Sequence, residues 1–318
     1  MYPLLLVPCV KDYLWGGTKL KTQYNINTEK EIVAELWMLS CHKDGENVVL
    51  NGKYQGESLT QVLQRWGKGA LGKSTEKFTD FPLLVKLIDA KENLSVQVHP
   101  DDAYAHQNEG ENGKTELWYV IDCDQGAQLV YGLKGAISQN ELEQRIKDNT
   151  LLEVCNTVPV QNGDVFFVTA GTLHAIGGGI RIAEVQQSSN ATYRVYDYGR
   201  VGVDGKPREL HINKALNVVV RKKPSEPYGN IGEVVKKGLT TQRLLASCEL
   251  FTTSVVELGN SMEFYSKNSF LSLVVLDGEA HLLWDKNELL IKGGDSVIIP
   301  ADFKVKIVGK AYILCSKV

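Results

Sequence analysis

From residue 240 to its C-terminus, the chain is a succession of short apolar segments that end in turn sequences. The turns are marked by the peptides LGN, LDGE, DKNE and KGGD. Apolar runs of about four to eight residues between turns rich in Gly, Asn and Asp are typical of β-strands. Many such strands without long intervening helices indicate a β-sandwich, jelly roll or barrel, and argue against alternating βαβ units.

A faint internal repeat links this region to the middle of the chain. The repeat pairs two sets of segments: 116–132 with 271–285, and 162–176 with 293–307. In this alignment Val305 stands opposite His174, and Leu271 stands opposite Glu116. The second copy therefore keeps the hydrophobic frame and loses the polar groups. We expect one functional β-barrel and one structural copy of it.

Helices are few in the rest of the chain. Ser58 followed by Gln61 forms a capping box at the start of a predicted helix over 58–66, and Ser138 with Glu141 starts another over 138–149. The remainder is predicted as strands, turns and loops: strands at 81–90, 94–100 and 116–122, a turn-rich segment at 101–115 and loops at 200–235. We expect a catalytic domain over 1–235, with small helical segments near 58–75 and 101–150, and a C-terminal jelly-roll domain over 236–318.

Composition excludes several classes of partner. The chain of 318 residues has 35 basic and 38 acidic side chains, a net charge of −3, so it lacks the basic excess that nucleic acid or anionic lipid would select. Apolar runs fall short of the ~20 residues that a membrane span needs, and the first ten residues do not resemble a signal peptide. The six cysteines are scattered without a C-x-x-C pair, which indicates reduced thiols and a cytoplasmic protein.

The segment LSVQVHPDD, residues 94–102, brings two polar side chains to one face of a strand. Gln97 and His99 lie two positions apart and share a face. A surface strand would show the same alternation, and a single histidine is more often a core or surface residue than a ligand. Together with Glu116 and His174, each near the end of a predicted strand, they form a set of two imidazoles, a carboxylate and an amide. Such a set suits a borderline cation such as zinc.

The sequence around His174 resembles the second motif of the cupin superfamily. Gly163, an apolar strand, Gly171 and His174 keep the motif's spacing, with Thr169 where proline is usual. The first cupin motif is less well kept. Gln97 replaces its first histidine, and the glutamate stands 17 residues after His99 rather than a few.

These two departures from the cupin pattern narrow the resemblance to one family, because the chain is similar to the type I mannose-6-phosphate isomerases, in a short bacterial form. The matching segments are YLWGG (13–17), AELWMLS (34–40), FPLLVKLIDAKENLSVQVHPDD (81–102), GKTELWYVI (113–121), GTLHAIGGG (171–179) and AEVQQSSNATYRVYDYGR (183–200). The resemblance implies a mainly β fold of cupin-type jelly-roll barrels, one metal-bearing and one degenerate, with a small helical insertion. It also implies an enzyme that interconverts mannose 6-phosphate and fructose 6-phosphate through an enediol(ate).

The resemblance assigns roles to individual residues. One Zn²⁺ per chain would be held by Gln97, His99, Glu116 and His174. The family's active-site arginine falls on Arg194, and the lysine of FPLLVK is Lys86.

The chemistry itself suggests further roles. Zinc with Arg194 beside it would stabilise negative charge on the substrate oxygens. Glu184 is the leading side chain for proton transfer, with a zinc-bound water as the alternative. Lys86 is a candidate for the phosphate or substrate oxygens, and Ser95 shares a strand face with the first two ligands.

Structural alternatives exist for three of these residues. Glu184 could be no more than a partner of Arg194, and Arg194 could pair with Asp197. Lys86 sits in an apolar strand, where an unpaired charge is costly, so it could instead form a buried ion pair with Glu35 or Asp89.

Two other functions compete with the isomerase. One is a non-enzymatic, metal-bearing cupin that binds sugars. The other is a different metal cupin enzyme, such as an iron dioxygenase or a cupin-type glucose-6-phosphate isomerase. The expected small-molecule partner is a phosphorylated hexose, and the sequence does not determine the oligomeric state.

Overall fold

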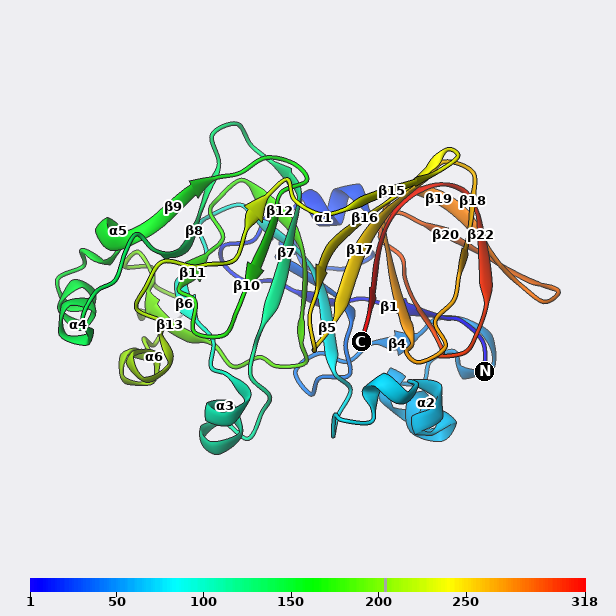
Figure 1. Ribbon diagram of the computed structural model, residues 1–318, viewed down its shortest axis with the longest axis horizontal. Helices are drawn as coiled ribbons and strands as arrows, with labels where there is room; N and C mark the ends of the chain where they lie inside the picture. Colours follow the sequence, from blue (N-terminus) through cyan, green and yellow to red (C-terminus); the bar gives the residue numbers. More distant parts are fainter. Residues whose placement is uncertain (203–204) are drawn as a thin grey trace. The chain divides into compact units, whose positions relative to one another are not determined.

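The computed structural model describes residues 1–202 and 205–318 (Figure 1). The fold is mainly β and its strand pairs are antiparallel, as the sequence predicts. The chain forms two compact units. The site unit consists of Lys11–Glu35 and Leu87–Asn230, and the C-terminal unit consists of Met1–Val10, Leu36–Lys86 and Ile231–Val318.

A ten-stranded sheet dominates the C-terminal unit. Its main path is, in order, β15 (Val234–Lys237), β16 (Thr240–Ser247), β17 (Thr252–Leu258), β22 (Val305–Lys317), β19 (Leu271–Trp284), β21 (Ser296–Ile299), β1 (Leu4–Val7) and β4 (Val48–Val49). Two more strands join it from the side: β18 (Ser261–Phe264) on β22 and β20 (Asn287–Lys292) on β19. The prediction that strands dominate from residue 240 onward is therefore confirmed. Two of them are longer than predicted, β22 with 13 residues and β19 with 14, and β19 continues through LDGE with a register shift between Val275 and Asp277 where a turn was predicted.

Two sheets contain the strands that carry the predicted ligands. The five-stranded sheet has the order β13 (Tyr193–Tyr196), β6 (Val96–Val98), β11 (His174–Ala175), β8 (Gln128–Leu133) and β9 (Cys155–Pro159). The seven-stranded sheet has the order β14 (Tyr228–Gly229), β10 (Val165–Val168), β7 (Glu116–Cys123), β12 (Ile180–Gln187), β5 (Leu83–Ala90), β3 (Glu35–Leu39) and β2 (Cys9–Lys11).

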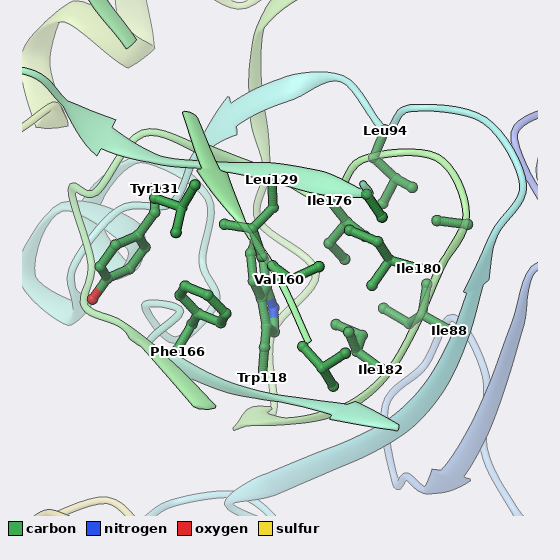
Figure 2. Packing of buried hydrophobic residues seen from close by; sticks show 14 of the residues in the cluster. Ile88, Leu94, Trp118, Leu129, Tyr131, Val160, Phe166, Ile176, Ile180 and Ile182 are labelled. Carbon is green, nitrogen blue, oxygen red and sulfur yellow. The ribbon is translucent and has the colours of Figure 1, made fainter. Parts of the chain in front are cut away.

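Figure 2 shows the core between these two sheets. Trp118 and Phe166 come from the seven-stranded sheet, Leu129 and Tyr131 come from the five-stranded sheet, and all four are buried in one cluster. The rings of Tyr131 and Phe166 meet edge to face with their centroids 5.5 Å apart. This packing holds the two sheets at a fixed separation, so side chains at their ends can meet.

The helices are short. They are α1 (Lys19–Gln23), α2 (Leu59–Trp66), α3 (Asp102–Asn108), α4 (Gln139–Lys147), α5 (Leu151–Val154) and α6 (Ile212–Val218), with 3₁₀ turns at Gly52–Tyr54, Lys68–Ala70 and Lys73–Thr75. Both predicted caps are present: Ser58 forms the capping box of α2, and Ser138 accepts from the Glu141 amide of α4. Across the described residues, no helix has the length and apolar character to cross a membrane.

Two helices fall in segments that were predicted as turns or loops. Helix α3 lies within 101–115 and buries only Ala105, while α6 lies within 200–235 and buries Ala215 and Leu216. Neither helix presents an apolar stripe long enough for helical periodicity to show in the sequence. The prediction of loops alone at 200–235 was wrong, whereas α3 lies within 101–150, where a small helical segment was expected.

Neither compact unit is one continuous stretch of the chain. Residues 1–10 and 36–86 group with the C-terminal strands, because β1 pairs with β21 on one side and with β4 on the other. The helical segment at 58–75 therefore belongs to the C-terminal unit rather than to the unit with the predicted ligands. A division at 235/236 into two functional domains stays a prediction.

The two copies of the internal repeat have the same local structure. Gly163 and Gly294 both adopt positive φ, +88° and +91°, a conformation that favours glycine. In each copy a short strand follows, β10 or β21, and the next strand begins at His174 or at Val305. The apolar residue of the second copy thus occupies the position that carries an imidazole in the first.

Candidate metal centre

Strands β6, β11 and β13 bring three predicted site residues side by side. In the sheet register His174 faces Gln97 on one side of β6, and Arg194 faces Gln97 on the other. Val96 and Val98 point to the opposite face, where they join a second apolar cluster. The alternation that the sequence predicted for this strand therefore separates core residues from site residues.

Glu116 comes to the same place from the other sheet, as the first residue of β7. Its carboxylate oxygens lie 3.3 Å from His174 Nε2 and 3.6 Å from His99 Nε2. Across the residues that the structure describes, these three form a group whose candidate ligand atoms all lie within 4.8 Å of one another. All three are buried. The predicted convergence of His99, Glu116 and His174 is thus present in the fold.

Hydrogen bonds to backbone carbonyls determine which ring nitrogens point inward. Nδ1 of His99 bonds to the Ala191 carbonyl and Nδ1 of His174 to the Thr172 carbonyl, each at 2.8 Å. A carbonyl only accepts, so each Nδ1 carries the proton and each neutral ring presents its Nε2 lone pair to the interior. Burial also lowers the pKa of His174 to about 3, which keeps its imidazole neutral.

The donor set fits a metal ion. The two Nε2 atoms lie 3.1 Å apart, and two lone pairs at that distance repel unless a proton or cation lies close to them. A carboxylate beside two imidazoles, each oriented by a carbonyl behind it, is the arrangement that metal sites use to fix their ligands. Two imidazole nitrogens and a carboxylate are donors that divalent metal ions of the first transition row accept. The share of Gln97 in the ligand set stays a prediction.

Lys114 also lies in this site, and the sequence reasoning missed it. Its ammonium donates to Glu116 Oε2 at 2.6 Å and to His99 Nε2 at 3.1 Å, and it lies 3.8 Å from Glu184 Oε1. The side chain is buried. A signal was available: Lys114 stands two residues before Glu116, which is the spacing that puts two side chains on one face of an extended chain.

Glu184 lies on β12, directly across the sheet from Trp118 of β7. The indole Nε1 of Trp118 donates to Glu184 Oε2 at 3.0 Å, and Lys114 Nζ is the cation close to Oε1. The carboxylate is buried. Glu184 therefore belongs to the same polar cluster as Lys114 and Glu116, and is oriented by a neutral donor on one side and a cation on the other.

Arg194 extends from β13 and is half-buried. Its Nε donates to Ser95 Oγ at 3.3 Å, and its Nη1 donates to the Glu209 carbonyl at 2.8 Å. Burial lowers the pKa of Arg194, and the nearby Arg208 guanidinium adds to this effect. Arg194 thus pairs with Gln97 in the sheet register and contacts Ser95, which stands two residues before Gln97. The roles of Arg194 and Ser95 toward a substrate stay predictions.

If Arg194 had only a structural role, Asp197 would be its expected partner. Its carboxylate instead accepts hydrogen bonds from two other guanidinium groups. Arg208 donates to both oxygens, at 2.7 and 2.6 Å, and Arg200 donates to Oδ1 at 2.5 Å. The hydrogen bonds of the Arg194 guanidinium go to Ser95 and to a backbone carbonyl.

Lys86 lies in the C-terminal unit, on β5. It is buried, and its ammonium stands 5.3 Å from the centre of the Trp37 ring. This is a cation–π distance. Its assignment as a substrate contact stays a prediction.

Comparison with known families gives two matches along the chain. Residues 4–123 match the phosphomannose isomerase type I catalytic domain, and residues 240–318 match the mannose-6-phosphate isomerase cupin domain. The second match covers the C-terminal strands that the repeat predicted to be a structural copy.

Similar proteins match over almost the whole chain. The mannose-6-phosphate isomerase of Streptococcus mutans is 38% identical, with 95% of this chain and 93% of the relative covered. Mannose-6-phosphate isomerase ManA of Bacillus subtilis is 37% identical, with 96% of each chain covered. The crystal structure of the mannose 6-phosphate isomerase from Bacillus subtilis superposes with a TM-score of 0.92 at 34% identity, and covers 100% of both chains.

Proposed function

The chain belongs to the type I phosphomannose isomerase family, and on that premise we propose that it is a zinc-dependent isomerase that interconverts mannose 6-phosphate and fructose 6-phosphate. The reaction moves a proton between C1 and C2 of the sugar through an enediol(ate). The observation that carries the proposal is the pair of buried imidazoles, His99 and His174, whose unprotonated Nε2 atoms meet beside Glu116.

Zinc would be held by His99, His174, Glu116 and Gln97, with one ion per chain. When bound, zinc supplies positive charge that stabilises negative charge on the carbonyl and hydroxyl oxygens of the sugar. Support for Gln97 comes from the sheet register, which places it directly beside His174.

Proton transfer is assigned to Glu184, with Lys114 beside it. A carboxylate can take a proton from one sugar carbon and return it to the next, provided that it stays oriented through both events. The hydrogen bond from Trp118 Nε1 to Glu184 supplies that orientation. Lys114 places a buried positive charge next to the carboxylate, where negative charge develops on the sugar oxygens during transfer.

Substrate binding is assigned to Arg194, Ser95 and Lys86. The Arg194 guanidinium can donate several hydrogen bonds in one plane and suits the oxygens of a sugar or a phosphate. Ser95 accepts from Nε of that guanidinium and the Glu209 carbonyl accepts from Nη1, and the Nη2 group is proposed to donate to the substrate. Lys86 is the second candidate cation for the phosphate.

A coupled assay on a panel of sugar phosphates tests the proposal. We expect the zinc-loaded protein to convert fructose 6-phosphate to mannose 6-phosphate, and the chelated protein to regain this activity when zinc is returned. No conversion after metal loading would instead favour a non-enzymatic sugar-binding cupin. Conversion of glucose 6-phosphate alone, or oxygen consumption with iron as the bound metal, would favour another metal cupin enzyme.

A cytoplasmic location and a small-molecule partner complete the proposal. All six cysteines are free thiols, as expected in a reducing compartment. The family supports a phosphorylated hexose as partner, and the near-balanced charge argues against nucleic acid or an anionic membrane as a partner.

A further inference from the structure

We propose that His211 is a positioning residue for the active-site arginine: its imidazole and its backbone amide hold the backbone of Arg194 and so aim the guanidinium. This inference rests on the role proposed above for Arg194. The sequence reasoning gave His211 no function.

The contact between the two residues is reciprocal. The Arg194 amide N–H donates to His211 Nδ1 at 3.2 Å, and the His211 amide N–H donates to the Arg194 carbonyl at 2.7 Å. Strand β13 is the edge of the five-stranded sheet, paired only with β6 in the sheet order. An edge strand needs partners for the backbone groups that face outward. His211 provides a partner for both the amide N–H and the carbonyl of Arg194.

The strand is irregular at this point, which makes such support necessary. The register between β13 and β6 shifts between Arg194 and Tyr196. A bulge interrupts the ladder hydrogen bonds and redirects the side chains next to it. The direction of the Arg194 side chain therefore depends on whatever fixes its backbone beside the bulge.

The same segment also holds the guanidinium itself. The Glu209 carbonyl, two residues before His211, accepts from Arg194 Nη1 at 2.8 Å. Residues 209–211 thus contact Arg194 at its amide, its carbonyl and its guanidinium. A shift of this segment would move the backbone and the side-chain tip of Arg194 together.

The imidazole must be neutral, with its proton on Nε2, to accept at Nδ1. Burial lowers the pKa of His211, which keeps the ring neutral at pH 7. Two acidic and two basic side chains lie around the imidazole. The Glu209 carboxylate lies 4.0 Å from Nε2, and Glu109 follows the end of α3. Lys214 of α6, which pairs with Glu109, and Arg194 of β13 are the basic ones. His211 is also the N-cap residue of α6 without a side-chain cap bond, so its Nδ1 is committed to Arg194 rather than to its own helix.

A pair of variants of similar size separates the acceptor from the bulk of the ring. His211→Asn puts an amide oxygen close to the position of Nδ1, whereas His211→Leu keeps the volume without an acceptor. We expect His211→Leu to lower kcat about tenfold or more, since a displacement of about 1 Å at such a site costs up to about a hundredfold. Zinc content should stay unchanged, and His211→Asn should restore most of the activity. His106→Ala, on the exposed face of α3, is the control.

Hydrogen exchange of the peptide that covers 193–196 supplies a readout independent of turnover. Loss of the acceptor should speed exchange of the Arg194 amide in His211→Leu, and His211→Asn should slow it again. Normal kcat in His211→Leu beside an inactive Arg194→Ala would overturn the inference, as would a His211→Asn variant that is folded and as impaired as His211→Leu. If His211→Leu does not fold, His211→Asn alone tests the inference: it must keep most of the wild-type kcat and the slow hydrogen exchange of the Arg194 amide. An active Arg194→Ala would overturn the proposed role of Arg194, and the exchange data would still test the contact.

Discussion

The Nε2 atoms of His99 and His174 lie 3.1 Å apart, and a backbone carbonyl fixes each ring through its Nδ1. The two rings come from neighbouring strands of one sheet, and Glu116 approaches them from the other sheet. Two lone pairs at this distance repel, and the Lys114 ammonium, 3.1 Å from His99 Nε2, offsets part of that repulsion. A cation bound to both nitrogens would offset it at both rings. Metal binding and the stability of this region should therefore be coupled.

The first prediction concerns the two histidines. His99→Ala and His174→Ala should each abolish turnover and lower the zinc content of the purified protein, because each removes a nitrogen ligand. Outer-shell changes alone typically cost about 10–100-fold in metal affinity, so loss of a direct ligand should cost more. Metal analysis and the coupled assay are the measurements. His281→Ala, at an exposed position of β19, is the matched control, and full zinc occupancy in His174→Ala would contradict the assignment.

Arg194 should behave differently from the ligands. Arg194→Ala should lower kcat at least about a hundredfold, the cost typical of losing one donor to a developing negative charge, and should leave zinc bound. Arg145→Ala, whose guanidinium pairs with Glu153 on the protein surface, should keep normal kinetics. If Arg194→Ala retains wild-type kcat and KM, the residue has no part in the reaction.

The polar cluster could be predicted from sequence only in part. Alternation in residues 94–99 predicted that Gln97 and His99 share a strand face, which is a local signal. The convergence of His99 with Glu116 and His174 rested on their residue types and on the resemblance to the cupin motif and to the type I mannose-6-phosphate isomerases. Lys114 was missed because it stands in a polar segment ahead of its strand, where a lysine is usually solvated. Its place in the site follows from the fold, in which β7 and β12 bring Glu116 and Glu184 close to its ammonium group.

The grouping of the first ten residues with the C-terminal strands cannot be predicted from local sequence. Strand β1 pairs with β21, so opposite ends of the chain lie in one sheet. Nothing in the first ten residues specifies that partner, because any edge with a matching apolar face would serve. The pairing with β21 follows from the complete sheet, whereas the capped helices α2 and α4 follow from residues within one helical turn.

The proposed proton shuttle leads to a third prediction. Glu184→Gln keeps the shape of the side chain and can still contact Trp118, but it cannot accept a proton. We expect kcat to fall about 10²–10⁴-fold, the usual contribution of a general base, with zinc content and melting temperature close to wild type. A variant that keeps more than half of the wild-type kcat would exclude Glu184 as the base.

Lys114 should be needed for turnover as well. Lys114→Met preserves the buried stem and removes the charge that lies between Glu116 and Glu184. Because the buried carboxylates of Glu116 and Glu184 would both lose this positive charge, we expect a lower melting temperature in the zinc-free protein and a lower kcat in the zinc-loaded protein. Lys134→Met, an exposed lysine that donates to the Glu153 carbonyl, is the control. Normal kcat in zinc-loaded Lys114→Met would limit Lys114 to a structural role.

The last prediction concerns Asp197, which binds Arg200 and Arg208 beside the site. Burial by itself raises the pKa of this carboxyl, but hydrogen bonds from the two guanidinium groups outweigh burial and leave the pKa below its ordinary value. A carboxylate of this kind stabilises the fold at pH values above its unfolded pKa of about 3.9 and loses that effect as the pH falls through the folded value. Asp197→Asn should therefore cost about 3 kcal/mol near pH 7, the lower range for breaking a buried ion pair.

The gap in melting temperature between wild type and Asp197→Asn should begin to narrow as the pH falls below about 4, because the unfolded wild-type chain then binds a proton at Asp197. It should narrow further as the pH falls through the lower pKa of the folded protein. Asp124→Asn removes the exposed partner of Lys19, so it should change the melting temperature little at any pH, as is usual for surface pairs. If Asp197→Asn melts at the wild-type temperature near pH 7, the two arginines do not depend on Asp197. A gap that stays constant down to pH 3 would show that the loss comes from packing and not from the charge of the carboxylate.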